Sequence, residues 1–128
     1  MSRILLDAGA LIALDRSERT MWGRLTVAAR DSTPLLTHGG IVGQVWRSAR
    51  KQAQVAKALK AVNVLPIDAD LGREAGLLLA KSGTADVLDA ALACLCESGD
   101  VVYTSDLDDL TMLIEARGIR NVAVVRVR

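Results

Sequence analysis

The sequence predicts an α/β domain with a largely parallel sheet of about five strands, covered by helices on both faces. Short apolar runs without polar alternation recur along the chain, and such runs are typical of buried parallel strands. Helical patterns separate these runs, and regular alternation of strand and helix favours this fold class. Because 128 residues is close to the commonest domain size, we expect a single domain over residues 1–128.

Five short segments have the composition of strands. They are residues 3–6 (RILL), 34–37 (PLLT), 62–67 (VNVLPI), 101–105 (VVYTS) and 121–127 (NVAVVRV). Each run is short enough for a strand and too short for a buried helix, which normally exceeds about ten residues. We therefore expect five strands.

Helical patterns fill the intervals between most of these strands. They cover residues 17–30, 41–60 with a break near 48–51, 68–81, 84–97 and 107–117. Asp68 and Thr84 are placed to cap helix starts. Gly83, Gly99 and Gly118 stand where helices should end.

The composition is that of an ordinary globular protein, with 51% hydrophobic and 24% charged residues. The net charge of +1 excludes nucleic-acid binding driven by an overall basic excess, so any such binding depends on local clusters. Two clusters exist. The larger holds Arg47, Arg50, Lys51, Lys57 and Lys60, and the smaller holds Arg120, Arg126 and Arg128. Basic residues on a helix are more often a solvated face than a binding site.

The remaining bulk features predict a cytoplasmic protein. The start of the chain lacks the apolar core of a signal peptide, and no apolar run approaches the roughly 20 residues that span a bilayer. Cys94 and Cys96 are two apart in a helical pattern, so they point to different sides and cannot pair. We expect both to be small core or boundary residues.

Two carboxylates follow predicted strands directly. Asp7 ends the first strand and Asp106 ends the fourth. In open parallel sheets, ligands bind beyond the carboxyl ends of strands where the strand order reverses. An acid at such a position is equally often a turn or cap residue. Together, Asp7 and Asp106 make this edge of the sheet the first place to expect a site.

The helical segment 84–97 adds two aspartates, Asp86 and Asp89, which lie three apart and share a face. Asp86 falls in the first turn and could simply complement the helix dipole. Asp89 lies beyond the expected first turn, among Leu88, Ala90 and their apolar neighbours. A charge there requires a cation or a hydrogen-bond partner.

Gathered carboxylates repel one another unless a cation holds them ionised, and all-oxygen sites suit Mg²⁺ or Mn²⁺. The chain has one histidine, His38, and no spacing typical of zinc or of a serine or cysteine nucleophile. A lone histidine at a strand end is more often structural. No Gly-rich phosphate loop is present. Phosphodiester hydrolysis and acceptance of a phosphoryl group on aspartate remain as candidate reactions.

Four motifs, in order along the whole chain, resemble those of the PIN-domain ribonucleases, and among these the VapC-type toxins of bacterial toxin–antitoxin pairs. LLDAGALIAL at 5–14 resembles the opening strand and its metal-binding aspartate, and VGQVWR at 42–47 resembles the second motif. DVLDAALA at 86–93 and TSDLDDL at 104–110 resemble the third and fourth. Each motif is weak alone, but four at the expected spacing are a strong signal.

The resemblance implies a three-layer α/β/α domain that cleaves RNA with Mg²⁺ or Mn²⁺. Asp7, Asp89 and Asp106 would hold the metal, with Thr104 belonging to the site and Asp86 as a further candidate ligand. It also implies a homodimer inhibited by a small antitoxin that lays a helix over an apolar groove. Ile12, Leu14, Trp22 and Trp46 are candidate groove residues, although core packing explains the two tryptophans at least as well. Arg47, Arg50 and Lys51 are candidate RNA contacts.

Gln44 departs from the pattern, because the second motif usually carries a glutamate at this position. Glutamine offers a carbonyl oxygen but no charge, and metal affinity follows the charge of the ligands. Asp86 and Asp109 could compensate if they turn inward. The alternative hypothesis is therefore a weak or inactive PIN-like module that binds RNA or a protein.

A phosphoacceptor receiver is a third hypothesis. Receivers place paired acids after the first strand and a lysine after the last. This chain has a single acid, Asp7, at the first position, and only arginines in its last segment. The hypothesis therefore ranks low.

Overall fold

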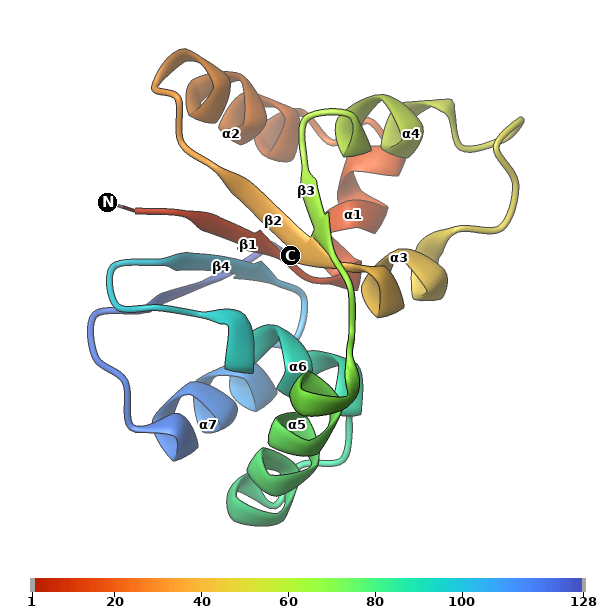
Figure 1. The fold of residues 1–128 in the computed structure, drawn as a ribbon. Coiled ribbons are helices and arrows are strands. Elements are labelled where there is room, and N and C mark those ends of the chain that lie inside the picture. Colours follow the sequence, from red (N-terminus) through yellow and green to blue (C-terminus); the bar gives the residue numbers. More distant parts are fainter. Residues whose placement is uncertain (1, 128) are drawn as a thin grey trace.

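The fold is known from a computed structural model that describes residues 2–127. Five parallel strands form one sheet in the order β3-β2-β1-β4-β5 (Figure 1). The strands are β1 (Ile4–Leu6), β2 (Leu35–His38), β3 (Asn63–Leu65), β4 (Val101–Thr104) and β5 (Ala123–Arg126). All five strands expected from the sequence are confirmed; β2 is shifted by one residue at equal length, and the other four are shorter than predicted.

Helices cover both faces of the sheet and make a three-layer α/β/α architecture (Figure 1). One layer holds α1 (Ala8–Asp15), α2 (Arg19–Arg30), α3 (Gly39–Val45) and α4 (Ala53–Leu59). The other holds α5 (Ala69–Ser82), α6 (Val87–Leu95) and α7 (Leu107–Arg117). The predicted fold class and the predicted break in the 41–60 helix are both confirmed.

The sequence interpretation missed helix α1, which begins directly after Asp7. This helix carries small or apolar residues on nearly all sides. It therefore lacks the alternation of apolar and polar side chains, with a period of 3.6 residues, that normally identifies a helix. Leu11 and Leu14 are fully buried in it. Leu14 therefore cannot line an open groove, which corrects its assignment as a groove residue, whereas Ile12 is exposed.

Two predicted helix boundaries are also corrected. Asp86, and not Thr84, is the N-cap of α6, because its Oδ1 accepts the Leu88 and Asp89 N–H groups. Asp89 consequently lies in the first turn of α6 and not beyond it. Gly99 lies in a turn after α6, whose C-cap is Cys96.

Three other predicted cap residues, Asp68, Gly83 and Gly118, are confirmed. Asp68 caps α5 by accepting the N–H of Leu71. Gly83 and Gly118 end α5 and α7 with left-handed backbone, which glycine adopts without steric cost.

The remaining notable side chains pack as boundary or core residues. Trp22 and Trp46 are half-buried against the core, and the Trp22 indole donates to the carbonyl oxygen of Leu14 at 2.9 Å. Cys96 is buried and Cys94 half-buried, and neither is paired. These observations agree with the expected packing roles.

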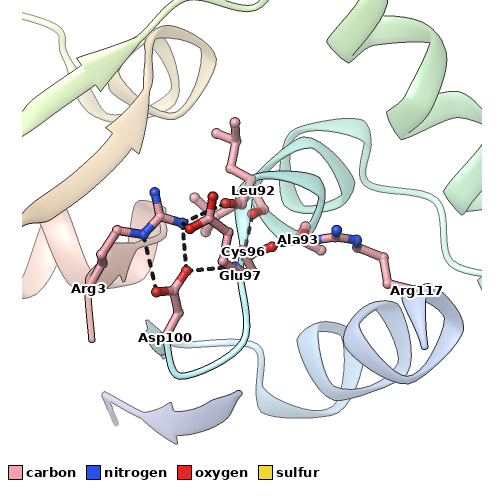
Figure 2. Close-up of polar contacts among 8 residues, drawn as sticks. Arg3, Leu92, Ala93, Cys96, Glu97, Asp100 and Arg117 are labelled. Atoms are coloured by element: carbon pink, nitrogen blue, oxygen red, sulfur yellow. Dashed lines mark hydrogen bonds and ion pairs between the residues drawn. The ribbon is translucent and has the colours of Figure 1, made fainter. Parts of the chain in front are cut away.

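Two arginines fix the C-terminal end of α6 (Figure 2). Arg117 of α7 donates to the carbonyl oxygens of Ala93, at 2.8 Å, and of Cys96. Arg3 donates to the Leu95 carbonyl oxygen at 2.9 Å and pairs with buried Asp100 at 2.7 Å. Cations at a helix C-terminus satisfy its last carbonyls and its dipole. The helix that carries Asp89 is thereby held at its far end.

Within residues 2–127, no helix is both long and apolar enough to cross a membrane.

Candidate metal centre at the carboxyl edge of the sheet

The strand order reverses between β1 and β4, because β2 lies on one side of β1 and β4 on the other. Asp7 follows β1 and Asp106 follows β4 by two residues, so both lie at this switch point. Ligand sites of open α/β sheets form in this crevice. The structure thus brings together the two acids that were selected from their positions at the carboxyl ends of predicted parallel strands.

Asp7 is buried and held by three donors. Its Oδ1 accepts the Ala10 N–H at 2.9 Å and caps α1. Its Oδ2 accepts the Thr104 hydroxyl at 2.6 Å and the Ser105 N–H at 3.1 Å. Burial raises the pKa of Asp7, and these hydrogen bonds lower it in part. The structure thus shows the capping role of Asp7, and this role leaves the carboxylate at the edge of the sheet where a site is expected.

Thr104 connects the two strand ends. Its hydroxyl donates to Asp7 and accepts the N–H of Asp106 at 2.8 Å. Asp106 in turn caps α7 by accepting the Asp109 N–H at 3.3 Å. Because Thr104 is fully buried, this chain of hydrogen bonds fixes the relative position of Asp7 and Asp106.

Asp89 approaches from α6. The residue is only 8% exposed, and its carboxylate makes no hydrogen bond or ion pair with any residue from 2 to 127. Its carboxylate oxygens are therefore the part of the side chain that reaches solvent. Burial, followed by the charges of Asp86, Asp7, Asp106 and Asp109, raises its pKa to about 7. These four carboxylates therefore lie within electrostatic reach of Asp89.

Asp7, Asp86, Asp89, Asp106 and Asp109 are called the acidic cluster below. The pKa of Asp109 is also raised, by desolvation and by Asp106. A concentration of carboxylates without a compensating cation is unfavourable, and a hard divalent ion would relieve it. The all-oxygen donor set is what Mg²⁺ and Mn²⁺ prefer.

The cluster is not closed into a ready-made cage. Among residues 2–127, no three His, Cys, Asp or Glu side chains are close enough together to hold a metal ion as they stand. The donor chemistry therefore fits a divalent cation, whereas binding requires the carboxylates to draw together. Asp89 has no hydrogen bond to lose among these residues when it does so.

The second motif lies at the same edge but does not join the acidic cluster through any hydrogen bond. Gln44 is exposed in α3, the helix that starts at the carboxyl end of β2, and its side chain is without a hydrogen bond in the described part of the chain. Arg47 donates to the Gly43 and Trp46 carbonyl oxygens and so caps α3. Arg50 and Lys51 are exposed in the segment that follows.

One positioning contact was not predicted from the sequence. His38, fully buried at the end of β2, bonds the carbonyl oxygen of Leu88 at 2.8 Å, directly before Asp89. Gly40 allows α6 to approach, since a Cβ there would lie 2.5 Å from the Leu88 side chain. The expectation that His38 is structural agrees with this geometry, but its connection to the acid-bearing helix depends on tertiary contact.

Two solved structures share the fold over almost the whole chain. One is VapBC2 from Rickettsia felis bound to a DNA fragment from their promoter, with a TM-score of 0.67, 11% identity and 100% of both chains covered. The other is DNA-bound VapBC from Salmonella typhimurium, with a TM-score of 0.67, 17% identity and 98% of both chains covered. No protein-family model and no curated protein sequence matches the chain. The likeness confirms the PIN-like fold expected from the four motifs.

Proposed function

We propose that this chain is a Mg²⁺- or Mn²⁺-dependent endoribonuclease and the toxin of a VapBC-like toxin–antitoxin pair. The acidic cluster at the switch point carries the proposal, because a carboxylate site of this kind serves phosphodiester hydrolysis. The fold shared with two VapBC structures supports the toxin assignment. The sequence shows no spacing typical of a serine or cysteine nucleophile, and this agrees with metal-assisted chemistry.

In this proposal Asp7, Asp89 and Asp106 hold the ion, with Asp86 beside them. When bound, the ion supplies an activated water and neutralises charge at the scissile phosphate. Thr104 keeps the Asp7 carboxylate oriented through its 2.6 Å hydrogen bond. Preorganisation of this kind avoids reorientation of the carboxylate during the reaction.

The distribution of charge supports an RNA substrate. Residues 1–60 hold ten of the 16 Arg and Lys residues but only four of the 15 Asp and Glu residues. The layer α1–α4 is therefore basic, although the whole chain is nearly neutral. A phosphate backbone must overcome repulsion from the acidic cluster, and nearby positive charge provides that attraction. We assign this role to Arg47, Arg50 and Lys51.

The proposed partners are a small antitoxin protein and a second copy of the chain. The two structural neighbours are VapBC assemblies, and this supports an antitoxin for the present chain. Co-expression with the product of an adjacent short reading frame, followed by light scattering on the purified complex, tests both. A monomer that recruits no such product contradicts this part of the proposal.

Asp89→Asn is a sharper test of catalysis than Asp7→Asn. Asp7 accepts three hydrogen bonds, so its amide variant disturbs the fold as well as the charge. Asp89 accepts none among the described residues, so Asp89→Asn removes charge alone. We expect Mg²⁺-dependent cleavage of RNA by the wild type and a loss of at least about 100-fold in Asp89→Asn.

Asp31→Asn is the matched control, because Asp31 is exposed after α2, near the amino end of the sheet. It should cleave like the wild type. Equal cleavage by Asp89→Asn and Asp31→Asn, or cleavage that persists in EDTA, would refute the proposal.

The second candidate is a non-catalytic PIN-like module that binds RNA or a protein, favoured by Gln44 and by the open arrangement of the acidic cluster. It predicts no Mg²⁺ binding in calorimetry at millimolar ion. Gln44→Glu adds the missing charge at the same position and should then create metal binding and cleavage. If Gln44→Glu leaves an inactive chain unchanged, Gln44 is not the limiting defect.

A further inference from the structure

A cavity of about 440 Å³ opens beside the acidic cluster. It is lined by Gly9, Ile12, Ala13, Arg16, Glu18, Ser105 and Val127. It is called the base pocket below. Its size lies in the range of small-molecule sites. None of the metal-site assignments above uses it.

The base pocket shares a wall with the acidic cluster. Ser105 donates its N–H to Asp7 at 3.1 Å and directly precedes Asp106. Gly9 lies two residues after Asp7, and a Cβ at this position would lie 2.1 Å from the Ser105 Oγ. Glycine at position 9 is therefore what allows the Ser105 side chain to sit where it does. A group in the base pocket lies next to whatever the acidic cluster binds.

The lining combines an apolar interior with polar groups. Ile12, Ala13 and Val127 supply apolar surface, and Ile12 is 37% exposed. Ser105 supplies a hydroxyl. Arg16 is exposed, and its guanidinium forms neither a hydrogen bond nor an ion pair with any other residue in 2–127. Glu18 also lines the pocket and is already engaged in an interaction of its own. The apolar surface, the Ser105 hydroxyl and the Arg16 guanidinium suit a flat heteroaromatic ring with polar edges and an attached phosphate.

We propose that the base pocket binds the base of the nucleotide adjacent to the scissile phosphate, and so selects where RNA is cut. The Ser105 hydroxyl meets the edge of that base, and Arg16 binds the neighbouring phosphate, for which a guanidinium is well suited. The ligand class is a nucleoside 5′-monophosphate unit. The inference rests on the proposed ribonuclease function, but its binding step can be measured without cleavage.

The first test is amide NMR of the ¹⁵N-labelled chain in EDTA, titrated with each of the four nucleoside 5′-monophosphates and with ribose 5-phosphate. We expect saturable shifts at Gly9, Ala13 and Ser105 with at least one nucleotide. Ribose 5-phosphate, which can engage only Arg16, should leave these three amides unshifted. Equal shifts with ribose 5-phosphate show a phosphate site only and overturn the proposal. Nucleotide shifts that fall outside the base pocket, or no shifts, also overturn it.

Ile12→Trp fills the base pocket with the larger indole and should weaken nucleotide binding about tenfold, or about 1.4 kcal/mol. Met112→Trp on α7 is the matched control, because Met112 is similarly exposed at 45% and lines no part of the pocket. It should bind like the wild type. Arg16→Ala changes an exposed side chain and provides a second variant that keeps the fold, with a similar expected loss. Unchanged binding in Ile12→Trp and Arg16→Ala contradicts the proposal.

Cleavage distinguishes this inference from the proposed function. On an RNA library, Ile12→Trp should lose base preference beside the cut while retaining metal-dependent cleavage, whereas Asp89→Asn should lose cleavage itself. A wild-type chain that binds nucleotides but cuts no RNA refutes the nuclease and leaves the base pocket standing. A chain that cuts with the same preference in Ile12→Trp refutes the base pocket and leaves the nuclease standing.

Discussion

The His38 Nε2 lies 2.8 Å from the carbonyl oxygen of Leu88 and joins the end of β2 to the first turn of α6. The His38 Nδ1 accepts the Ile41 N–H at 3.2 Å. Because Nδ1 accepts, the proton of the neutral ring is on Nε2, which therefore donates to Leu88. Burial lowers the pKa of His38 and favours this neutral form. One imidazole thus caps α3 and positions the helix that carries Asp89.

His38→Ala should lower the free energy of unfolding by about 3 kcal/mol, because it removes a buried ring and two hydrogen bonds. Urea denaturation at pH 8 measures this loss. The pH dependence provides a second check. The unfolded imidazole binds a proton near its ordinary pKa of 6.5, whereas the folded one stays neutral to lower pH. The unfolded state therefore binds more protons as the pH falls, and stability declines below about pH 6.5.

This decline is best measured in an Asp89→Asn background, since Asp89 titrates in the same range with the opposite sign. The free energies of unfolding of Asp89→Asn and of the double variant Asp89→Asn/His38→Ala should differ less at pH 5 than at pH 8. A difference that grows as the pH falls would show that folding favours the imidazolium.

Asp89→Asn should stabilise the metal-free chain at alkaline pH. The pKa of Asp89 is raised from 3.8 to about 7 in the folded state, chiefly by burial and then by the neighbouring carboxylates. The folded state binds the proton more tightly, so stability is lost as the pH rises from about 4 to 7. At pH 8 in EDTA, we expect the free energy of unfolding of Asp89→Asn to exceed that of the wild type by about 2 kcal/mol. At pH 4 the two proteins should be nearly equal. A constant difference between pH 4 and pH 8 contradicts the raised pKa.

Much of the site followed from the sequence because local order places it. Asp7 comes directly after β1 and Asp106 two residues after β4, and parallel strands bring their carboxyl ends to one edge. Asp89 was marked by its apolar neighbours, and it is indeed buried. Apolar runs and helical periods likewise depend only on neighbouring residues, so the five strands and most helices could be predicted.

The rest depends on tertiary contact that no local pattern encodes. Helix α1 lacks an amphipathic period because small and apolar residues occupy its exposed side as well as its buried side. The start of α6 was misplaced because Thr84 and Asp86 are both good caps, and only the fold decides between them. The contact of His38 with Leu88 spans 50 residues. The base pocket arises where α1 approaches Ser105 and Val127, far apart in sequence.

Thr104→Val should show how much the orientation of the Asp7 carboxylate matters, because it leaves the number of carboxylates in the acidic cluster unchanged. Valine keeps the shape but removes the hydroxyl that donates to Asp7 and accepts the N–H of Asp106. The unpaired Asp106 N–H and the lost donor should lower the free energy of unfolding by about 2 kcal/mol. Cleavage should fall by about tenfold or more while all metal-ligand candidates remain. Thr104→Ser retains the hydroxyl and should recover most of the cleavage rate. Equal rates for the valine and serine variants would exclude a role for the hydroxyl.

Arg117→Met should destabilise the fold through the far end of α6. The guanidinium is half-buried and donates to two carbonyl oxygens at this terminus, that of Cys96 and that of Ala93, which also accepts the Cys96 N–H at 3.2 Å. Methionine preserves much of the side-chain volume, so the loss reports hydrogen bonds and charge. We expect the free energy of unfolding to fall by about 2 kcal/mol. Arg73→Met is the matched control, because Arg73 forms an exposed ion pair with Asp70, and such pairs contribute less than about 1 kcal/mol. Chemical denaturation of both variants decides the matter: equal, small losses would mean that α6 is held by apolar packing against α5 and α7 and not by its C-terminal cap.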